Sequence, residues 1–162
     1  MPEHEWDTAM ALAVRVLDSI QHMTNRGQVA GSLRRKRTQV HDIDLLLIPK
    51  PLMWPGAIGT HLQKEMDAEI TKSGAKLMSV TIEGIQVDLY ASNQESWGIH
   101  LIRWTGSTAN NIWLCKQAHK QGMKLAVSRG LMKDGELIAS RTERDVFDAL
   151  GLPWMAPEER ER

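Results

Sequence analysis

The chain has 162 residues with 20 basic and 20 acidic side chains, and its zero net charge excludes a protein that binds nucleic acid through a strongly cationic surface. Its single cysteine, Cys115, excludes an intramolecular disulfide, and no apolar run approaches the roughly 20 residues that cross a bilayer. The acidic start at Glu3 and Glu5 is unlike a signal peptide, so we expect a soluble cytoplasmic protein without membrane contact.

Hydrophobic periodicity predicts the elements of the first half of the chain. Apolar residues recur every three or four positions after Trp6, which indicates an amphipathic helix, and Pro49 and Pro51 end an apolar strand. In chain order we expect a helix over 6–23, a break at Gly27, a Gly-Ser turn at 31–32, a strand over 40–48, a helix over 57–71 and a hairpin with arms 77–82 and 85–90.

From about Asn93 the pattern indicates a separate lobe. Its predicted elements are a helix around 99–104, a helix over 110–121, a hairpin centred on 133–135, a short helix over 143–150 and a charged tail over 158–162. We therefore predict two domains, residues 1–92 and residues 93–162.

Three acids lie where two apolar strands are predicted. Asp42 and Asp44 alternate along the first strand, so their side chains share one face, and Asp88 interrupts an apolar run of the second. Two carboxylates about 4 Å apart repel by roughly 4 kcal/mol at an effective dielectric near 20, so such a cluster requires a positive partner. A pair of Mg²⁺ ions, which prefer carboxylate oxygens, is the obvious candidate, although a lone buried acid is more often a cap or an ion-pair partner.

A possible phosphate cradle precedes these acids by about ten residues. Gly31 lets the backbone approach a ligand, Ser32 adds a hydroxyl donor, and the guanidinium groups of Arg34 and Arg35 can bind phosphate through two hydrogen bonds. Taken alone, the basic run is more typical of a solvated loop, and its position ahead of Asp42 is what favours a binding role.

The ordered set of motifs resembles the family X DNA polymerases, the polymerase beta superfamily of nucleotidyltransferases. The resemblance covers nearly the whole chain and rests on Gly31–Arg35, the Asp-x-Asp pair at 42 and 44, Val87–Leu89, Trp104–Ser107 with Asn111, Gly122–Leu125, Asp134–Glu136, Arg141–Phe147 and Gly151–Trp154. It implies an α+β fold, with a nucleotidyltransferase palm of mixed β-sheet and flanking helices in residues 1–92. A small C-terminal α+β lobe in residues 93–162 would close over the nucleotide.

The resemblance also implies roles for individual residues. The metal ligands would be Asp42, Asp44 and Asp88, holding two Mg²⁺ ions for which Mn²⁺ can substitute, with Asp88 next to the primer 3′-hydroxyl. The residues that match nucleotide contacts are Gly31, Ser32, Arg35, Trp104, Thr105, Gly106 and Asn111. Weaker DNA contacts are assigned to Arg34, Lys116, Lys120 and Lys124, for which an exposed basic face is an equally good interpretation.

Several positions depart from the family pattern. Arg103-Trp104 replaces the usual Tyr-Phe and is closer to the polymerase mu and terminal transferase branch. Cys115 and Gln86 stand where the family has arginines, from which we expect reduced fidelity. An amino-terminal lyase domain is not recognised in the sequence, so we expect a minimal form with weak, salt-sensitive DNA binding.

The predicted function is a family X DNA polymerase that adds deoxynucleoside triphosphates (dNTPs) to a DNA 3′-hydroxyl by a two-metal mechanism. We expect a monomer that acts on primer-template or gapped DNA and fills short gaps in DNA repair with low fidelity. A template-independent terminal transferase is the nearest alternative, suggested by Arg103-Trp104. A nucleotidyltransferase for small substrates ranks lower, and an inactive DNA-binding or scaffold relative is the alternative outside catalysis.

Overall fold

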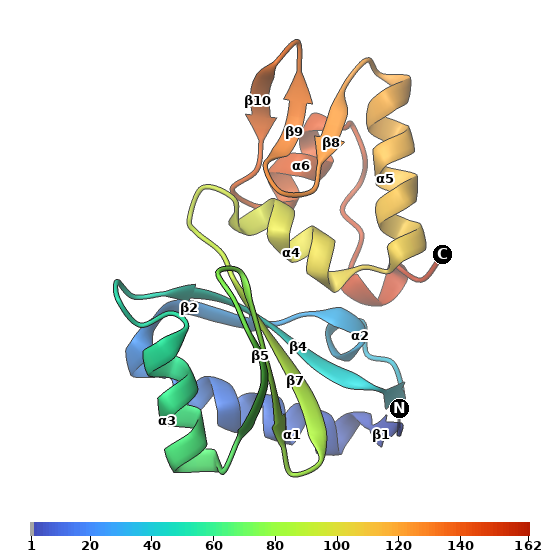
Figure 1. Cartoon of the computed structure of the whole chain (residues 1–162). Helices are drawn as coiled ribbons and strands as arrows, with labels where there is room; N and C mark the ends of the chain where they lie inside the picture. The colour runs from blue at the N-terminus through green and yellow to red at the C-terminus, as the bar shows by residue number, and fades with distance from the viewer. Residues whose placement is uncertain (1) are drawn as a thin grey trace. The chain divides into compact units, whose positions relative to one another are not determined.

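A computed structural model describes residues 2–162, which fold into two compact units. One unit comprises the chain up to Ser92, and the other runs from Asn93 to Arg162 (Figure 1). Both units combine helices with a β-sheet, so the predicted α+β fold class is confirmed.

The first unit is built on a five-stranded mixed sheet. Its elements are β1 (His4–Glu5), α1 (Trp6–Ser19), η1 (Gln21–Met23), β2 (Thr24–Val29), α2 (Gly31–Arg34), β3 (Gln39–Val40), β4 (Asp42–Pro49), α3 (Gly56–Met66), β5 (Glu69–Ser73), β6 (Leu77–Ile82) and β7 (Ile85–Ala91). The strand order is β2-β4-β7-β6-β5, in which β4 and β7 are parallel and the other neighbours are antiparallel. β1 and β3 form a separate two-stranded ribbon.

The core of this unit lies between the sheet and two helices. Helices α1 and α3 cover one face of the sheet (Figure 1), and their buried side chains, such as Leu12 and Ile58, pack in one cluster with strand residues. Ile43, Leu45 and Leu47 alternate along β4 and belong to this cluster. Because strand side chains alternate between the two faces, Asp42 and Asp44 point to the opposite face.

Two sequence predictions for this unit are wrong in detail. The helix predicted over 57–71 ends at Met66, because Asp67 adopts a left-handed conformation and Glu69–Ser73 pairs with β6 as an edge strand. Ile70, an apolar position that suggested the longer helix, packs on the core from this strand instead. The break predicted at Gly27 is instead the interior of β2, where a β-carbon would lie 2.9 Å from a methyl group of Leu17.

The second unit packs helices around a three-stranded antiparallel sheet of order β10-β9-β8. Its elements are α4 (Trp97–Thr105), α5 (Thr108–Lys120), β8 (Lys124–Ala126), β9 (Gly130–Lys133), β10 (Glu136–Ala139), α6 (Glu143–Ala149) and η2 (Pro157–Glu159). The oxygens of Ser107 and Thr142 accept hydrogen bonds from backbone N–H groups in the first turns of α5 and α6, which caps both helices. The buried core includes Ile102, Leu114 and Phe147.

The segment predicted as a charged tail is partly buried in this unit. Arg160 is fully buried, donates from Nη1 to Oε2 of Glu143 at 2.5 Å, and donates from Nη2 to the carbonyl of Met155 at 2.8 Å. Its guanidinium carbon also lies 5.2 Å from the ring centre of Phe147. The run of charged residues at 158–162 predicts an exposed tail. It does not reveal the burial of Arg160, because the partner Glu143 lies 17 positions earlier in the sequence.

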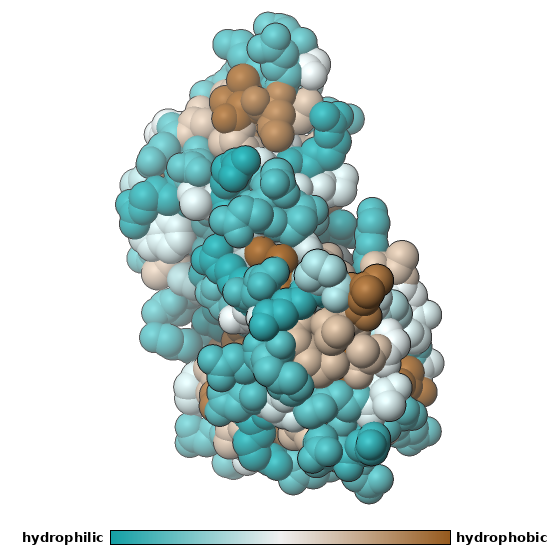
Figure 2. Space-filling view, turned by 90° about the vertical axis from the view of Figure 1, so that its left-hand side faces the viewer, coloured by the Kyte–Doolittle hydropathy of each residue, from teal (hydrophilic) through white to brown (hydrophobic). Residues whose placement is uncertain are grey.

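Polar side chains dominate the visible surface. Figure 2 shows a mostly hydrophilic face on which hydrophobic residues form small separate groups. Within residues 2–162, no helix combines the length and the apolar character needed to cross a bilayer.

Candidate active site

The three acids predicted from the sequence meet on one face of the central sheet. β4 and β7 are parallel neighbours, and their register places Asp44 beside Asp88 and Asp42 beside Gln86. One carboxylate oxygen from each of Asp42, Asp44 and Asp88 lies within 4.8 Å of the other two. Asp88 is 8% exposed, so this negative charge is held at the edge of the core.

Two uncharged side chains form hydrogen bonds with two of these carboxylates. The hydroxyl of Tyr90 donates to Oδ1 of Asp44 at 3.2 Å, and Nε2 of Gln86 lies 3.1 Å from both carboxylate oxygens of Asp88. The sequence motifs predict no site role for Tyr90, and Gln86 stands out in them only as a departure from a family pattern. Gln86 and Tyr90 lie two residues before and two residues after Asp88 on a predicted strand. This spacing places all three side chains on one face and could have identified both residues.

The cluster resists full ionisation in the absence of a cation. Burial raises the pKa of Asp44 to about 7, and the charges of Asp42 and Asp88 act in the same direction against the opposing effects of the Tyr90 hydrogen bond and the Arg35 charge. Burial and the charge of Asp88 also raise the pKa of Asp42. Three converging carboxylates are a hard-oxygen donor set of the kind that Mg²⁺ or Mn²⁺ prefers, so these residues fit a divalent cation.

The Gly-Ser turn lies directly against this cluster. The backbone N–H of Ala30 donates to the carbonyl of Asp44 at 2.8 Å, and Gly31 follows with a φ of 62°. A β-carbon at Gly31 would come within 2.0 Å of Oδ2 of Asp44, so only glycine fits. Arg35 is the C-terminal cap of α2, and its charge acts to lower the pKa of Asp44 against the larger effect of burial. The first unit therefore brings the turn, Arg35 and the three acids together.

The predicted nucleotide contacts of the second unit gather where α4 meets α5. Trp104 and Thr105 end α4, and Gly106 forms the turn with a φ of 70°. The side chain of Thr105 is buried, and Nδ2 of Asn111 donates to the carbonyl of Arg103 at 2.9 Å. The guanidinium carbon of Arg103 stacks 4.4 Å from the centre of the Trp104 ring.

A groove of about 540 Å³ runs along the exposed face of α5. It is lined by Thr108, Asn111, Ile112, Cys115, Lys116, His119, Lys120 and Val127. Two of the predicted DNA contacts, Lys116 and Lys120, thus share a face with Asn111. Lys124 lines a different hollow of about 690 Å³ with His119 and Arg129, and Arg34 belongs to α2 of the first unit.

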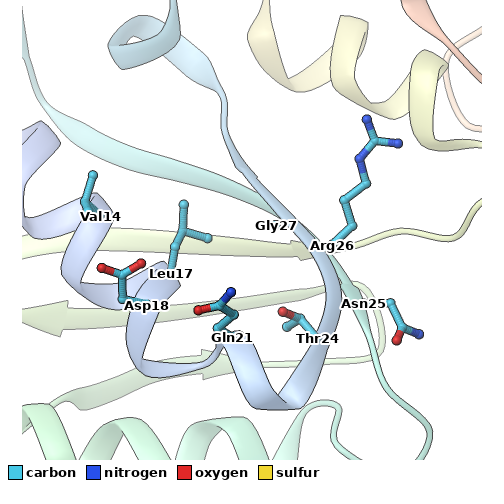
Figure 3. A pocket seen from close by; sticks show the side chains of 8 residues that line it. All are labelled: Val14, Leu17, Asp18, Gln21, Thr24, Asn25, Arg26 and Gly27. Carbon is cyan, nitrogen blue, oxygen red and sulfur yellow. The ribbon is translucent and has the colours of Figure 1, made fainter.

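A third groove, of about 470 Å³, lies between α1 and the edge strand β2. Figure 3 shows Asp18 on α1 and Arg26 on β2 among the side chains that line it. These are the charged residues among its lining side chains, so this groove lacks the converging carboxylates that would hold a metal ion.

Sequence comparison relates both units to known polymerases. The family model for the DNA polymerase beta thumb matches residues 100–161. DNA polymerase IV of Saccharomyces cerevisiae is 32% identical over 75 residues, which are 46% of this chain and 13% of the yeast protein. DNA polymerase/3′-5′ exonuclease PolX of Bacillus subtilis is 28% identical over 137 residues, which are 82% of this chain and 24% of that protein. The chain thus spans about a quarter or less of the length of either relative.

The fold agrees with these sequence matches. A crystal structure of Leishmania infantum polymerase beta in a ternary P/T complex superposes with a TM-score of 0.84 at 19% identity, covering 99% of this chain and 77% of the other. The predicted resemblance to the family X DNA polymerases is therefore confirmed. The polymerase beta fold accounts for the mixed sheet of the first unit and for the small α+β second unit.

Proposed function

We propose that this chain is a family X DNA polymerase that adds a deoxynucleotide to a DNA 3′-hydroxyl and releases pyrophosphate by a two-metal mechanism. The observation that carries the proposal is the convergence of Asp42, Asp44 and Asp88, whose carboxylate oxygens lie within 4.8 Å of one another. Paired divalent ions at such a site stabilise the charge that develops on the attacking and leaving oxygens.

In this proposal, different residues of the first unit bind the metal ions and the triphosphate. Asp42, Asp44 and Asp88 hold Mg²⁺, with Mn²⁺ as a substitute, and Asp88 accepts or directs the proton of the 3′-hydroxyl. Ser32 and Arg35 bind the triphosphate of the incoming dNTP, and Gly31 lets the backbone come close. Residues 1–92 would then be the catalytic palm.

The second unit, residues 93–162, would close over the nucleotide. In this proposal Trp104, Thr105 and Gly106 lie against its sugar and base, and Asn111 contacts the base edge in the minor groove. Because Asn111, Lys116 and Lys120 line one groove on α5, that helix face supports a role in holding the primer-template. Lys124 and Arg34 are weaker candidates for DNA contacts.

We further propose short-gap filling in DNA repair, by a cytoplasmic monomer of low fidelity. Cys115 and Gln86 stand where the family pattern has arginines, so each position lacks a positive charge, which supports reduced fidelity. Zero net charge supports weak DNA binding that falls steeply with salt. Long products made without dissociation from a primed single strand would contradict gap filling.

Replacing Asp88 tests the catalytic proposal. Asp88→Asn keeps the shape of the side chain but removes its charge, and we expect incorporation to fall by about a thousandfold or more. Asp67→Asn is the matched control, because Asp67 is an exposed helix cap that tolerates asparagine in its left-handed conformation. Incorporation that is unchanged by Asp88→Asn would remove this residue from the mechanism, and a wild-type chain that binds DNA without incorporation would favour the scaffold alternative.

A template-independent terminal transferase is the second candidate. The Arg103-Trp104 pair, whose side chains stack, suggests it, because the pair stands where much of the family has Tyr-Phe and is closer to the polymerase mu and terminal transferase branch. Primer extension with Mg²⁺ and with Mn²⁺, on gapped, nicked, templated and single-stranded primers, separates the two candidates. Efficient extension of the single strand would decide for the transferase.

A further inference from the structure

The acidic cluster lies on two neighbouring strands, β4 and β7, and its residues form rows that continue onto β6. Asp42, Gln86 and Thr81 form one row, from β4, β7 and β6 respectively. The next row contains Asp44 and Asp88, and Tyr90 follows Asp88 two residues later on β7. Gln86, Asp88 and Tyr90 therefore share one face of the sheet, with a hydrogen-bond donor on each side of the acid.

These two donors fix two of the three carboxylates. Nε2 of Gln86 is equally distant, at 3.1 Å, from both oxygens of Asp88, which holds the plane of that carboxylate. The hydroxyl of Tyr90, a residue that is only 8% exposed, donates to a single oxygen of Asp44. Each carboxylate oxygen has more than one lone pair, so both acids can accept these bonds and still bind a cation.

Both donors are uncharged, so they orient the acids without adding a positive charge to the site. A guanidinium or an ammonium at position 86 could donate to Asp88 equally well, but it would add a positive charge beside the cation. At an effective dielectric near 20, a unit charge about 5 Å from a divalent cation weakens its binding by well over tenfold. An amide and a phenol orient the acids without this penalty.

We propose that Gln86 and Tyr90 are positioning residues of the acidic site, and that their neutrality lets the three carboxylates bind a divalent cation before any nucleotide arrives. This inference rests on the proposed function for the identity of the ligand set. It adds a metal-bound state of the free protein and assigns the residues that stabilise this state.

The test is calorimetric titration of the free chain with Mn²⁺ alone, without nucleotide or DNA. We expect the wild type to bind Mn²⁺, Gln86→Arg to weaken binding by at least about tenfold through its charge, and Gln86→Met and Tyr90→Phe to weaken it a few-fold through lost orientation. Thr81→Val is the matched control, because Thr81 lies beside Gln86 on β6, and its affinity should equal that of the wild type. Thermal melting in EDTA shows whether each variant is folded.

The outcomes separate this inference from the proposed function. Equal Mn²⁺ affinity for wild type and Gln86→Arg, or equal losses for Gln86→Arg and Gln86→Met, would overturn the role assigned to neutrality. Mn²⁺ uptake that occurs only with a dNTP present would overturn the nucleotide-free state but leave the polymerase proposal intact. No uptake even with a dNTP would overturn both.

Discussion

Gly31 and Asp44 are in such close contact that a β-carbon on the glycine would lie 2.0 Å from Oδ2 of the aspartate. The same glycine has a φ of 62°, which other residues adopt only with strain. Two constraints thus act at one position, and both arise because the turn before β4 folds back onto the acid that β4 carries. The glycine of the Gly-Ser motif is therefore needed for the shape of the site.

Gly31→Ala should therefore destabilise the first unit and disturb the acids together. We expect a loss of about 2 to 4 kcal/mol in the free energy of unfolding, from backbone strain and from the clash with Asp44. Chemical denaturation measures the loss. Gly56→Ala is the control, since a β-carbon there meets nothing within 4 Å, and its stability should stay within about 1 kcal/mol of the wild type. Equal stability of the two variants would contradict the packing seen at Gly31.

The raised pKa of Asp44 predicts how stability depends on pH in the absence of metal. Its pKa is about 7 in the folded protein against an ordinary value of 3.8, so between these values the folded state binds more protons than the unfolded state. The free energy of unfolding in EDTA should then fall by roughly 1 to 3 kcal/mol as the pH rises from 4 to 8. The raised pKa of Asp42 acts in the same direction.

Asp44→Asn should remove most of this pH dependence, because the amide has no charge to desolvate. Urea unfolding at pH 5 and pH 8 provides the measurement, with Asp67→Asn as the control that keeps the wild-type slope. Added Mg²⁺ should stabilise the wild type more at pH 8 than at pH 5, since it binds the ionised carboxylates. A wild-type stability in EDTA that rises with pH over this range would show that Asp44 ionises more easily than its burial indicates.

The second unit depends on the buried pair of Arg160 and Glu143. Their side chains are 0% and 6% exposed, so Arg160→Ala removes the guanidinium that compensates a buried carboxylate, and we expect a loss of about 3 to 5 kcal/mol. The control is Arg15→Ala, which removes an ion pair with Glu83 whose side chains are 55% and 57% exposed, and should cost less than about 1 kcal/mol. Similar losses in the two variants, measured by chemical denaturation, would contradict a structural role for the tail.

The lysines of the α5 groove should set the salt dependence of DNA binding. If Lys116 and Lys120 each neutralise a phosphate, Lys116→Ala and Lys120→Ala should each reduce the slope of log K against log salt by about one. Binding to a gapped duplex, followed by fluorescence anisotropy at several salt concentrations, measures the slope. Lys64→Ala, on the last turn of α3, should leave it unchanged. If all three variants have the slope of the wild type, Lys116 and Lys120 do not contact DNA phosphates and DNA does not bind along α5.

Local patterns predicted those parts of the fold that depend on neighbours in sequence. The alternation of Asp42 and Asp44 with apolar residues was enough to place both acids on one face of β4. Strand β5 was missed because Glu69–Ser73 is a short edge strand whose pairing with β6 decides its conformation.

The roles of Tyr90 and Arg160 could not be read from the sequence for a related reason. Tyr90 meets Asp44 only because β4 and β7 pair in one register, and Arg160 meets Glu143 only because the tail packs on α6. Both contacts join residues that are distant in the chain, so neither leaves a periodic signal. Asp88 was an exception, because an acid inside an apolar run is conspicuous without knowledge of its neighbours.

The parallel pairing of β4 with β7 also determines when the acids can first meet during folding. Between these strands the chain forms α3, β5 and β6, and parallel neighbours require such a long connection to be completed before they pair. A nascent chain that has not reached Asp88 therefore lacks the third acid even when β4 is formed. A divalent ion held by the three acids, as we propose, should bind only after the sheet is complete and should not nucleate its assembly.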